Sequence, residues 1–271
     1  MSHMFADLTH PQIQRAIARK TILLLPFGQT EEHGTHLAVG ADTIIAERVA
    51  AAVAEAVAGK PPVLILPTVP YGYSPRVMTK WPGTFTVRLG VIVDYLADVC
   101  SSAARMGFDK IAIITTHGPH IDVARLAARN VFDATGVGVV ITQPTVFAGP
   151  AFNKVRTSAP GGVCHACEFE TSMLMHFGYP VSLKGLTSRD RVKTCNEWVA
   201  GDGFRSGKVT WSTWALQGSD SGAYGDPTPA TAATGKVCMD AIVAEYCRFL
   251  KYFHGHDVPR RQLATKGTKK R

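Results

Sequence analysis

Apolar and polar positions along the chain follow two alternating patterns, one typical of buried strands and the other of helices. Four short continuous apolar runs have the length of strands buried on both faces, and they occupy residues 21–26, 63–66, 111–114 and 137–142. Apolar side chains at helical spacing occur over residues 42–58, 91–106, 121–134, 168–177 and 229–253. The segments predicted to be irregular are residues 69–86, 145–162 and 184–225.

Strands that alternate with helices predict an α/β fold with a mostly parallel central sheet and helices on both of its faces. In such sheets, ligands bind outside the carboxyl ends of the strands. Two polar stretches directly follow predicted strands, residues 28–42 after the first and residues 115–120 after the third. We therefore expect these two stretches to meet at one edge of the sheet.

Carboxylates and imidazoles crowd into these stretches, at Glu31, His33, Asp42 and His117. A mixed set of nitrogen and oxygen ligands suits Zn, Mn or Fe better than Ca or Mg. Asp42 opens a predicted helix, where its carboxylate could bridge two cations that share and activate one water. Each residue alone could be a helix cap or a buried structural histidine. Their grouping at corresponding strand ends favours a metal site.

Composition and charge narrow the class of protein. The 271 residues are 46% hydrophobic, which suits a single α/β domain. No apolar run reaches the ~20 residues of a membrane helix, no secretory signal opens the chain, and six scattered cysteines suggest no disulfide framework. These features predict a cytoplasmic protein with reduced thiols and no membrane partner.

Three parts of the chain are expected to differ in role. Residues 1–4 have the character of a cloning remnant, residues 5–256 form the domain, and residues 257–271 form a basic, disordered tail. Six basic residues after Asp257 carry most of the net charge of +8. The domain itself is therefore close to neutral, and we expect no nucleic-acid partner.

Residues 28–42 resemble the pattern G-x-x-E-Q-H-G-x-H-L-P-x-x-x-D of the creatininase (creatinine amidohydrolase) family. Four later blocks match that family in order: WPGT at 81–84, HG at 117–118, HACEFETS at 165–172 and GDP at 225–227. The resemblance implies a three-layer α/β architecture and a homo-oligomer, often a hexamer. It also implies a metal-dependent amidohydrolase that cleaves a non-peptide C–N bond with a metal-bridged hydroxide.

The resemblance implies two divalent metal ions, Zn, Mn or Fe, bound by Glu31, His33, Asp42 and His117, with Asp42 bridging. A further family ligand is a glutamate two residues after the second metal histidine, and this position is Pro119 here. We expect an acid of the block at residues 165–172 to replace it, with Glu170 as the first choice and Glu168 as the second.

The resemblance also assigns catalytic and substrate-binding roles. His165 aligns with a family histidine close to the substrate, and we assign it proton transfer to the leaving nitrogen; Glu168 is a candidate general base. The long loop after the second strand offers three candidate substrate contacts, Tyr73, Arg76 and Trp81. An aromatic–acid pair of creatininase falls on residues 161–162, which are both glycine here. We therefore expect a small amide, cyclic amide or formamide as substrate, and not creatinine.

Three other readings use different residues. Cys164 and Cys167 have the C-x-x-C spacing of redox sites, although the surrounding pattern is not that of a thioredoxin. A non-haem iron oxygenase could use His117, His120 and Asp122, but this leaves the acids of residues 31–42 without a role. The remaining alternative is a non-catalytic binding module.

Overall fold

Four parallel strands form the central sheet of the computed structural model, which describes residues 3–212 and 217–256. The strands are β1 (Ile22–Phe27), β2 (Val63–Ile65), β3 (Ile111–Thr115) and β4 (Val139–Thr142), in the spatial order β2-β1-β3-β4. In the register of this sheet, Leu24 pairs with Ile65 on one side and with Ala112 on the other. The predicted parallel α/β sheet is confirmed.

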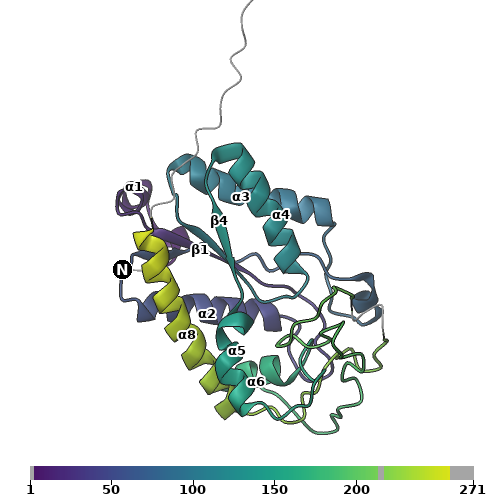
Figure 1. The fold of residues 1–271 in the computed structure, drawn as a ribbon. Coiled ribbons are helices and arrows are strands. Elements are labelled where there is room, and N and C mark those ends of the chain that lie inside the picture. The colour runs from purple at the N-terminus through teal and green to yellow at the C-terminus, as the bar shows by residue number, and fades with distance from the viewer. Residues whose placement is uncertain (1–2, 213–216, 257–271) are drawn as a thin grey trace, which may run out of the picture.

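Helices cover both faces of the sheet (Figure 1). One face packs against α2 (Ala41–Ala56), α5 (Pro144–Val155), α6 (Glu168–His176) and α8 (Ala232–Gly255). The other face packs against α1 (His10–Ala18), α3 (Leu89–Met106) and α4 (His120–Thr135). Two short 3-10 helices are η1 (Phe5–Asp7) and η2 (Arg76–Lys80).

The continuous apolar run of β1 is explained by these two cores. Successive side chains of a strand point to opposite faces. Ile22 and Leu24 pack into the core under α2 and α8, whereas Leu23 and Leu25 pack into the core under α3 and α4. Both faces are buried, so β1 has no position at which a polar residue would meet water.

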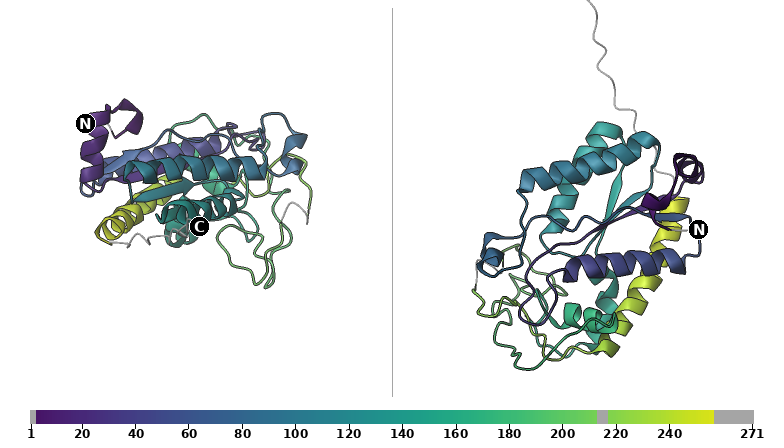
Figure 2. Two further views of the ribbon diagram at one scale, coloured as in Figure 1. Left: turned by 90° about the horizontal axis from the view of Figure 1, so that it is seen from above. Right: turned by 180° about the vertical axis from the view of Figure 1, so that it is seen from behind.

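The strand order places a crevice at the ends of β1 and β3. From β1, the chain crosses through α2 to β2 on one side, and then through α3 to β3 on the other side of β1. The two connections leave the sheet in opposite directions, which is the arrangement that opens a ligand crevice at the carboxyl ends of the strands. The described part of residues 184–225 gathers with η2 at one end of the molecule, away from α1 (Figure 2).

The prediction of an irregular segment over residues 145–162 is wrong, because α5 occupies most of it. Pro144 stands at the start of this helix, where its missing N–H costs nothing. Ala148 and Phe152 are buried four residues apart on its inner face. The signal was hidden by Pro150, which lies inside the helix and is normally a helix breaker.

Residues before β1 are part of the fold. α1 was not predicted from the sequence, although Thr9 and Gln12 form a capping box at its start. The backbone N–H of Ile65 donates to the carbonyl of His3 over 2.7 Å, and Met4 forms a parallel bridge with Ile65. Residues 3 and 4 thus contact the edge of the sheet, whereas the predicted basic tail at 257–271 lies outside the described residues.

None of the helices in the described part of the chain is long and apolar enough to span a bilayer.

Candidate metal centre

The segment between β1 and α2 brings three ionisable side chains into the interior. After β1, the chain passes so close to the start of α2 that a Cβ on Gly28 would lie 2.3 Å from Thr43 Cα. Only glycine fits such an approach. Glu31 and His33 follow in the loop and Asp42 lies in the first turn of α2, and all three side chains are buried.

The first candidate group consists of Glu31, Asp42 and His117, whose possible ligand atoms lie within 4.8 Å of one another. His117 Nδ1 lies 3.3 Å from Glu31 Oε2 and 3.1 Å from Asp42 Oδ2. The other ring nitrogen, Nε2, donates to the backbone carbonyl of Tyr73 over 3.2 Å. This hydrogen bond turns Nδ1 towards the carboxylates, as a ligand nitrogen requires.

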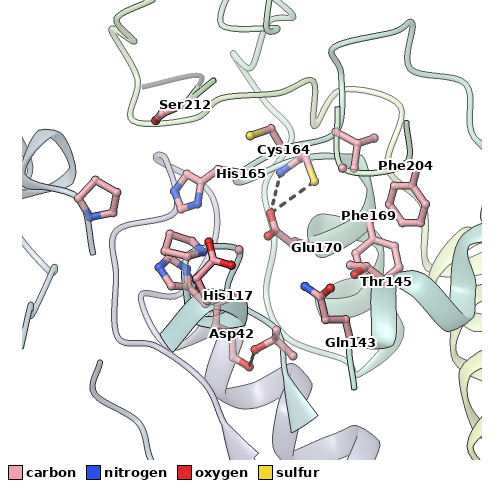
Figure 3. Close-up of a pocket in the computed structure, with 18 of the residues that line it drawn as sticks. Asp42, His117, Gln143, Thr145, Cys164, His165, Phe169, Glu170, Phe204 and Ser212 are labelled. Atoms are coloured by element: carbon pink, nitrogen blue, oxygen red, sulfur yellow. Dashed lines mark hydrogen bonds and ion pairs between the residues drawn. The ribbon is translucent and has the colours of Figure 1, made fainter. Parts of the chain in front are cut away.

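The second candidate group consists of His33, Asp42 and Glu170, again within 4.8 Å. His33 Nδ1 donates to the carbonyl of Glu31 over 3.0 Å, so Nε2 carries the lone pair, 3.9 Å from Asp42 Oδ2. Glu170 is held through Oε2, which accepts from the backbone N–H of Cys167 at 3.1 Å and from its Sγ at 3.4 Å (Figure 3).

These side chains fit a pair of divalent ions. Asp42 belongs to both groups, so the two positions share one carboxylate. His33 Nε2 is buried and finds no hydrogen-bond partner in the described part of the chain. A buried polar atom without a partner is costly, and a cation facing the lone pair removes that cost. Imidazole nitrogens with carboxylate oxygens are a donor set for Zn, Mn or Fe.

The ionisation of the metal-free groups is strongly coupled. Burial opposes the charge of Asp42, but His117 and His33 hold the pKa of its carboxyl below the usual value. Burial also opposes the charge of His117, but Glu31 and Asp42 outweigh it and raise the pKa of His117 to about 9. Burial raises the pKa of Glu31 and of Glu170. Protons on the imidazoles thus balance the carboxylates until cations replace them.

His165 lies beside both groups on the segment that precedes α6. Its Nε2 donates to the carbonyl of Glu32 over 2.8 Å, and its Nδ1 lies 3.8 Å from Glu31 Oε2. The ring centroids of His165 and His33 are 4.3 Å apart. Burial, followed by the charges of His33 and His117, lowers the pKa of His165 well below its ordinary value. The ring is therefore neutral at pH 7.

A cavity of about 770 Å³ opens over these residues. Asp42, His117, His165 and Glu170 lie on its wall (Figure 3). Tyr73 also lines it, as its prediction as a substrate contact requires.

A family model described as creatininase (creatinine amidohydrolase) matches residues 6–250, which is nearly the whole chain. The chain belongs to the creatininase family. It is therefore an enzyme of a hydrolase family.

Curated relatives of this creatininase-family chain carry several names. The mycofactocin precursor peptide peptidase of Mycolicibacterium smegmatis is 30% identical over 227 residues, which cover 79% of this chain and 78% of the relative. The 3-dehydro-scyllo-inosose hydrolase of Thermotoga maritima is 28% identical over 175 residues. That match covers 62% of this chain but only 54% of the relative, so the chain spans about half of it. A solved manganese creatininase shares the fold, with a TM-score of 0.75 at 19% identity over 94% of this chain and 100% of that structure.

Of the two acids in the block at residues 165–172, only Glu170 belongs to a candidate metal-binding group. The Glu168 side chain is fully buried and accepts from the backbone N–H groups of Thr157 and Ser158 at 3.0 and 2.9 Å. It therefore anchors the segment after α5 to the start of α6. We do not retain Glu168 as a general base or as a metal ligand, because its oxygens are held by these amides.

Glu32 is a buried carboxylate that the sequence analysis missed, although it stands where the creatininase-family pattern has glutamine. Its Oε2 accepts from the Gly34 N–H over 2.9 Å, and its Oε1 lies 3.8 Å from His165 Nε2. Burial raises the pKa of Glu32 to about 7. The adjacent acids Glu31 and Glu32 could have drawn attention to this position, but the sequence does not show that Glu32 lies beside His165.

The remaining predicted residues belong to neither candidate group. Arg76 and Trp81, predicted to bind substrate, are not among the described residues that line the cavity. The residues proposed for an iron oxygenase do not converge either, because Asp122 is exposed and pairs with Arg125, and His120 belongs to neither candidate group. Within the described part of the chain, neither Cys164 nor Cys167 forms a disulfide.

Proposed function

We propose that the chain is a metal-dependent hydrolase that cleaves the carbon–nitrogen bond of a small amide, cyclic amide or formamide. The observation that carries this proposal is that Asp42 belongs to both candidate groups. A carboxylate shared by two sets of nitrogen and oxygen ligands is what a pair of ions requires. When bound, a pair of Zn, Mn or Fe ions supplies Lewis acidity and lowers the pKa of a shared water.

The chain's own residues divide the work of holding the ions. We assign Glu31 and His117 to one position, His33 and Glu170 to the other, and Asp42 to both. Tyr73 and Cys167 orient two of these ligands through hydrogen bonds at 3.2 and 3.1 Å. Such outer partners fix ligand orientation and contribute to metal affinity.

His165 is the proposed proton carrier. Its hydrogen bond to Glu32 fixes the Nε2–H tautomer, and Nδ1 lies on the side of Glu31. Because its pKa is low, the ring is unprotonated at rest, and Nδ1 takes up the proton that the water loses as it attacks the carbonyl. The same nitrogen then gives that proton to the leaving amine. General acid–base help of this kind contributes roughly 10²–10⁴-fold.

We also propose that the enzyme is a homo-oligomer. Large apolar side chains are exposed at the start of α3 and on the preceding segment, with Phe85 58%, Leu89 49% and Tyr95 51% exposed. A group of such side chains is typical of a protein–protein contact. Sedimentation of the purified chain as a monomer at all concentrations would contradict this part.

The function is tested by metal analysis combined with a substrate screen. The protein is stripped with a chelator, reloaded with Zn, Mn or Fe, and assayed on amides, lactams and formamides. Short peptides belong in the screen because several relatives are named peptide peptidases. We expect about two ions per chain and turnover that disappears with the chelator and returns with metal. Turnover that survives complete removal of metal would refute the proposal.

A further inference from the structure

The cavity next to the two candidate groups carries no lysine or arginine in the part that the structure describes. Its ionisable lining consists of Asp42, Asp122, Glu170, Tyr73 and two histidines, with the thiols of residues 164 and 167. Arg156, at the end of α5, does not line the cavity, and its guanidinium donates two hydrogen bonds to the carboxylate of Asp202, at 3.0 and 2.9 Å. A carboxylate or phosphate of a ligand that occupied the part of the cavity away from the candidate metal groups would therefore lose hydrating water. No cationic side chain there would compensate for this cost.

One wall of the cavity is a fixed aromatic surface. Phe204 packs against Phe152 and Phe169, with ring centroids 4.7 and 5.5 Å apart. Phe152 and Phe169 are themselves only 5.6 Å apart, so three rings hold one another in place. Phe169 and Phe204 lie on one side of Glu170, whereas His117 and His165 lie on the other side (Figure 3).

The mouth of the cavity continues this apolar character. Val146 of α5 and Trp211 both line it, and they are 64% and 59% exposed. The lining also includes the neutral polar side chains of Gln143 and Thr145. An aromatic or aliphatic group placed here removes apolar surface from water on both partners, which favours binding.

We propose that this cavity selects substrates whose non-reacting part is an aromatic or aliphatic group without negative charge, and that it rejects a carboxylate there. The inference rests on the proposed function, because the metal groups must hold the reacting carbonyl at one end. A volume of about 770 Å³ leaves room for a ring beyond the reacting group. A cationic substituent is tolerated, because Asp122 and the aromatic rings are compatible with it.

The test uses three hydroxamic acids, because a hydroxamate chelates metal ions and anchors all three probes in the same way. They are benzohydroxamate, 4-carboxybenzohydroxamate and 4-(aminomethyl)benzohydroxamate, titrated calorimetrically into the metal-loaded enzyme. We expect the carboxylated probe to bind at least about tenfold more weakly than the parent compound, and the aminomethyl probe to bind about as well as the parent. A carboxylated probe that binds equally or more tightly would overturn the inference.

A positive charge placed in the cavity should reduce this discrimination against the carboxylated probe. Val146→Lys adds a cation at an exposed lining position, and Leu126→Lys adds the same charge on α4, at a residue 59% exposed that does not line the cavity. We expect Val146→Lys to strengthen binding of the carboxylated probe about three- to fivefold and Leu126→Lys to leave it unchanged. No gain in Val146→Lys would show that the ring lies elsewhere.

The two proposals fail in different ways. Metal content and amide turnover are measured on the same preparation as the probe titrations. Two bound ions with turnover, but no binding of any of the three probes, would refute the cavity assignment and leave the hydrolase proposal standing. Absence of bound ions after reloading would refute the hydrolase proposal, and the substrate selection would fall with it.

Discussion

His120 accepts a hydrogen bond at Nε2 from the backbone N–H of Tyr73, over 3.0 Å. Its fully buried ring stacks on Phe27 with centroids 3.8 Å apart, and burial lowers the pKa of His120 to about 2. The ring is therefore neutral and keeps its acceptor nitrogen. The carbonyl of Tyr73 in turn accepts a hydrogen bond from His117, so His120 helps to position a proposed metal ligand although it belongs to neither candidate group.

Replacing His120 with leucine should weaken metal binding at the group of Glu31, Asp42 and His117. Loss of the acceptor frees the backbone of Tyr73, and loss of an outer partner typically lowers metal affinity by about 10–100-fold. Competition with a chromophoric chelator measures this affinity. His10→Leu on exposed α1 is the control, and His120→Asn should recover part of the loss because its amide oxygen can accept. Equal affinity in His120→Leu and His10→Leu would contradict this role.

Metal stoichiometry should distinguish the shared ligand from an unshared one. Asp42→Ala removes a member of both groups and should reduce the content from about two ions per chain to none. Glu170→Gln removes a member of the second group alone and should leave about one. Asp240→Ala, at an exposed acid on α8, should keep both. Elemental analysis after dialysis measures all three, and full metal content in Asp42→Ala would end the proposal of a shared carboxylate.

His165→Ala should separate metal binding from proton transfer. His165 belongs to neither candidate group, so the variant should keep its ions. Its kcat should fall by roughly 10²–10⁴, because the leaving nitrogen loses its proton source. Steady-state kinetics with metal analysis on the same sample measure both. An unchanged kcat would remove His165 from the mechanism.

Metal affinity should rise with pH. Burial opposes a proton on His117, but Glu31 and Asp42 outweigh it and raise the pKa from 6.5 to about 9, so the metal-free ring is protonated at neutral pH. An ion must displace this proton, and apparent affinity should increase by up to about tenfold per pH unit until about pH 9. Titrations in buffers of different ionisation enthalpy count the released proton. In His117→Gln, fewer protons should be released, because the proton of His117 is missing.

The raised pKa of His117 also predicts that the metal-free protein loses stability as the pH rises. A proton bound more tightly in the folded state stabilises it fully below the unfolded pKa of 6.5, and this contribution is lost as pH rises through about 9. Thermal unfolding in the presence of a chelator should therefore show Tm falling between these values. A flat profile would show that His117 is not held by the carboxylates.

Glu168→Ala should destabilise the fold without touching the chemistry. It leaves the amides of Thr157 and Ser158 without their acceptor, which should lower the free energy of unfolding by about 1–3 kcal/mol. Denaturant unfolding measures the loss, and Glu168→Gln, which keeps one acceptor oxygen, should lose less. If Glu168 were instead the general base, both variants would lose kcat while Glu168→Gln kept its stability.

Residues that directly follow buried strands were predictable from the sequence alone. Glu31 and His117 follow different strands, and the rule that parallel strands end at one edge predicts that they lie close together. The two acids of α6 were harder. Glu168 and Glu170 are two residues apart, so on a helix they point in different directions, and the sequence could not show which one faces the ions.

Long-range partners escaped prediction for a different reason. The contact between Glu32 and His165 depends on how the segment before α6 folds back over the loop after β1, and no local pattern encodes this. Phe204 and Trp211 lie in a stretch without periodicity, so their place on the cavity wall could not be inferred. α5 was missed because Pro150 obscured its apolar face.

The candidate ligands come from the β1–α2 loop, the first turn of α2, the β3–α4 turn and the first turn of α6. A pair of ions would cross-link these four pieces of chain. The first two are consecutive in sequence, whereas the β3–α4 turn and the start of α6 are far from them and from each other. Occupancy would then restrain the same backbone that shapes the substrate chamber, and depletion would loosen that chamber as well as abolish its chemistry.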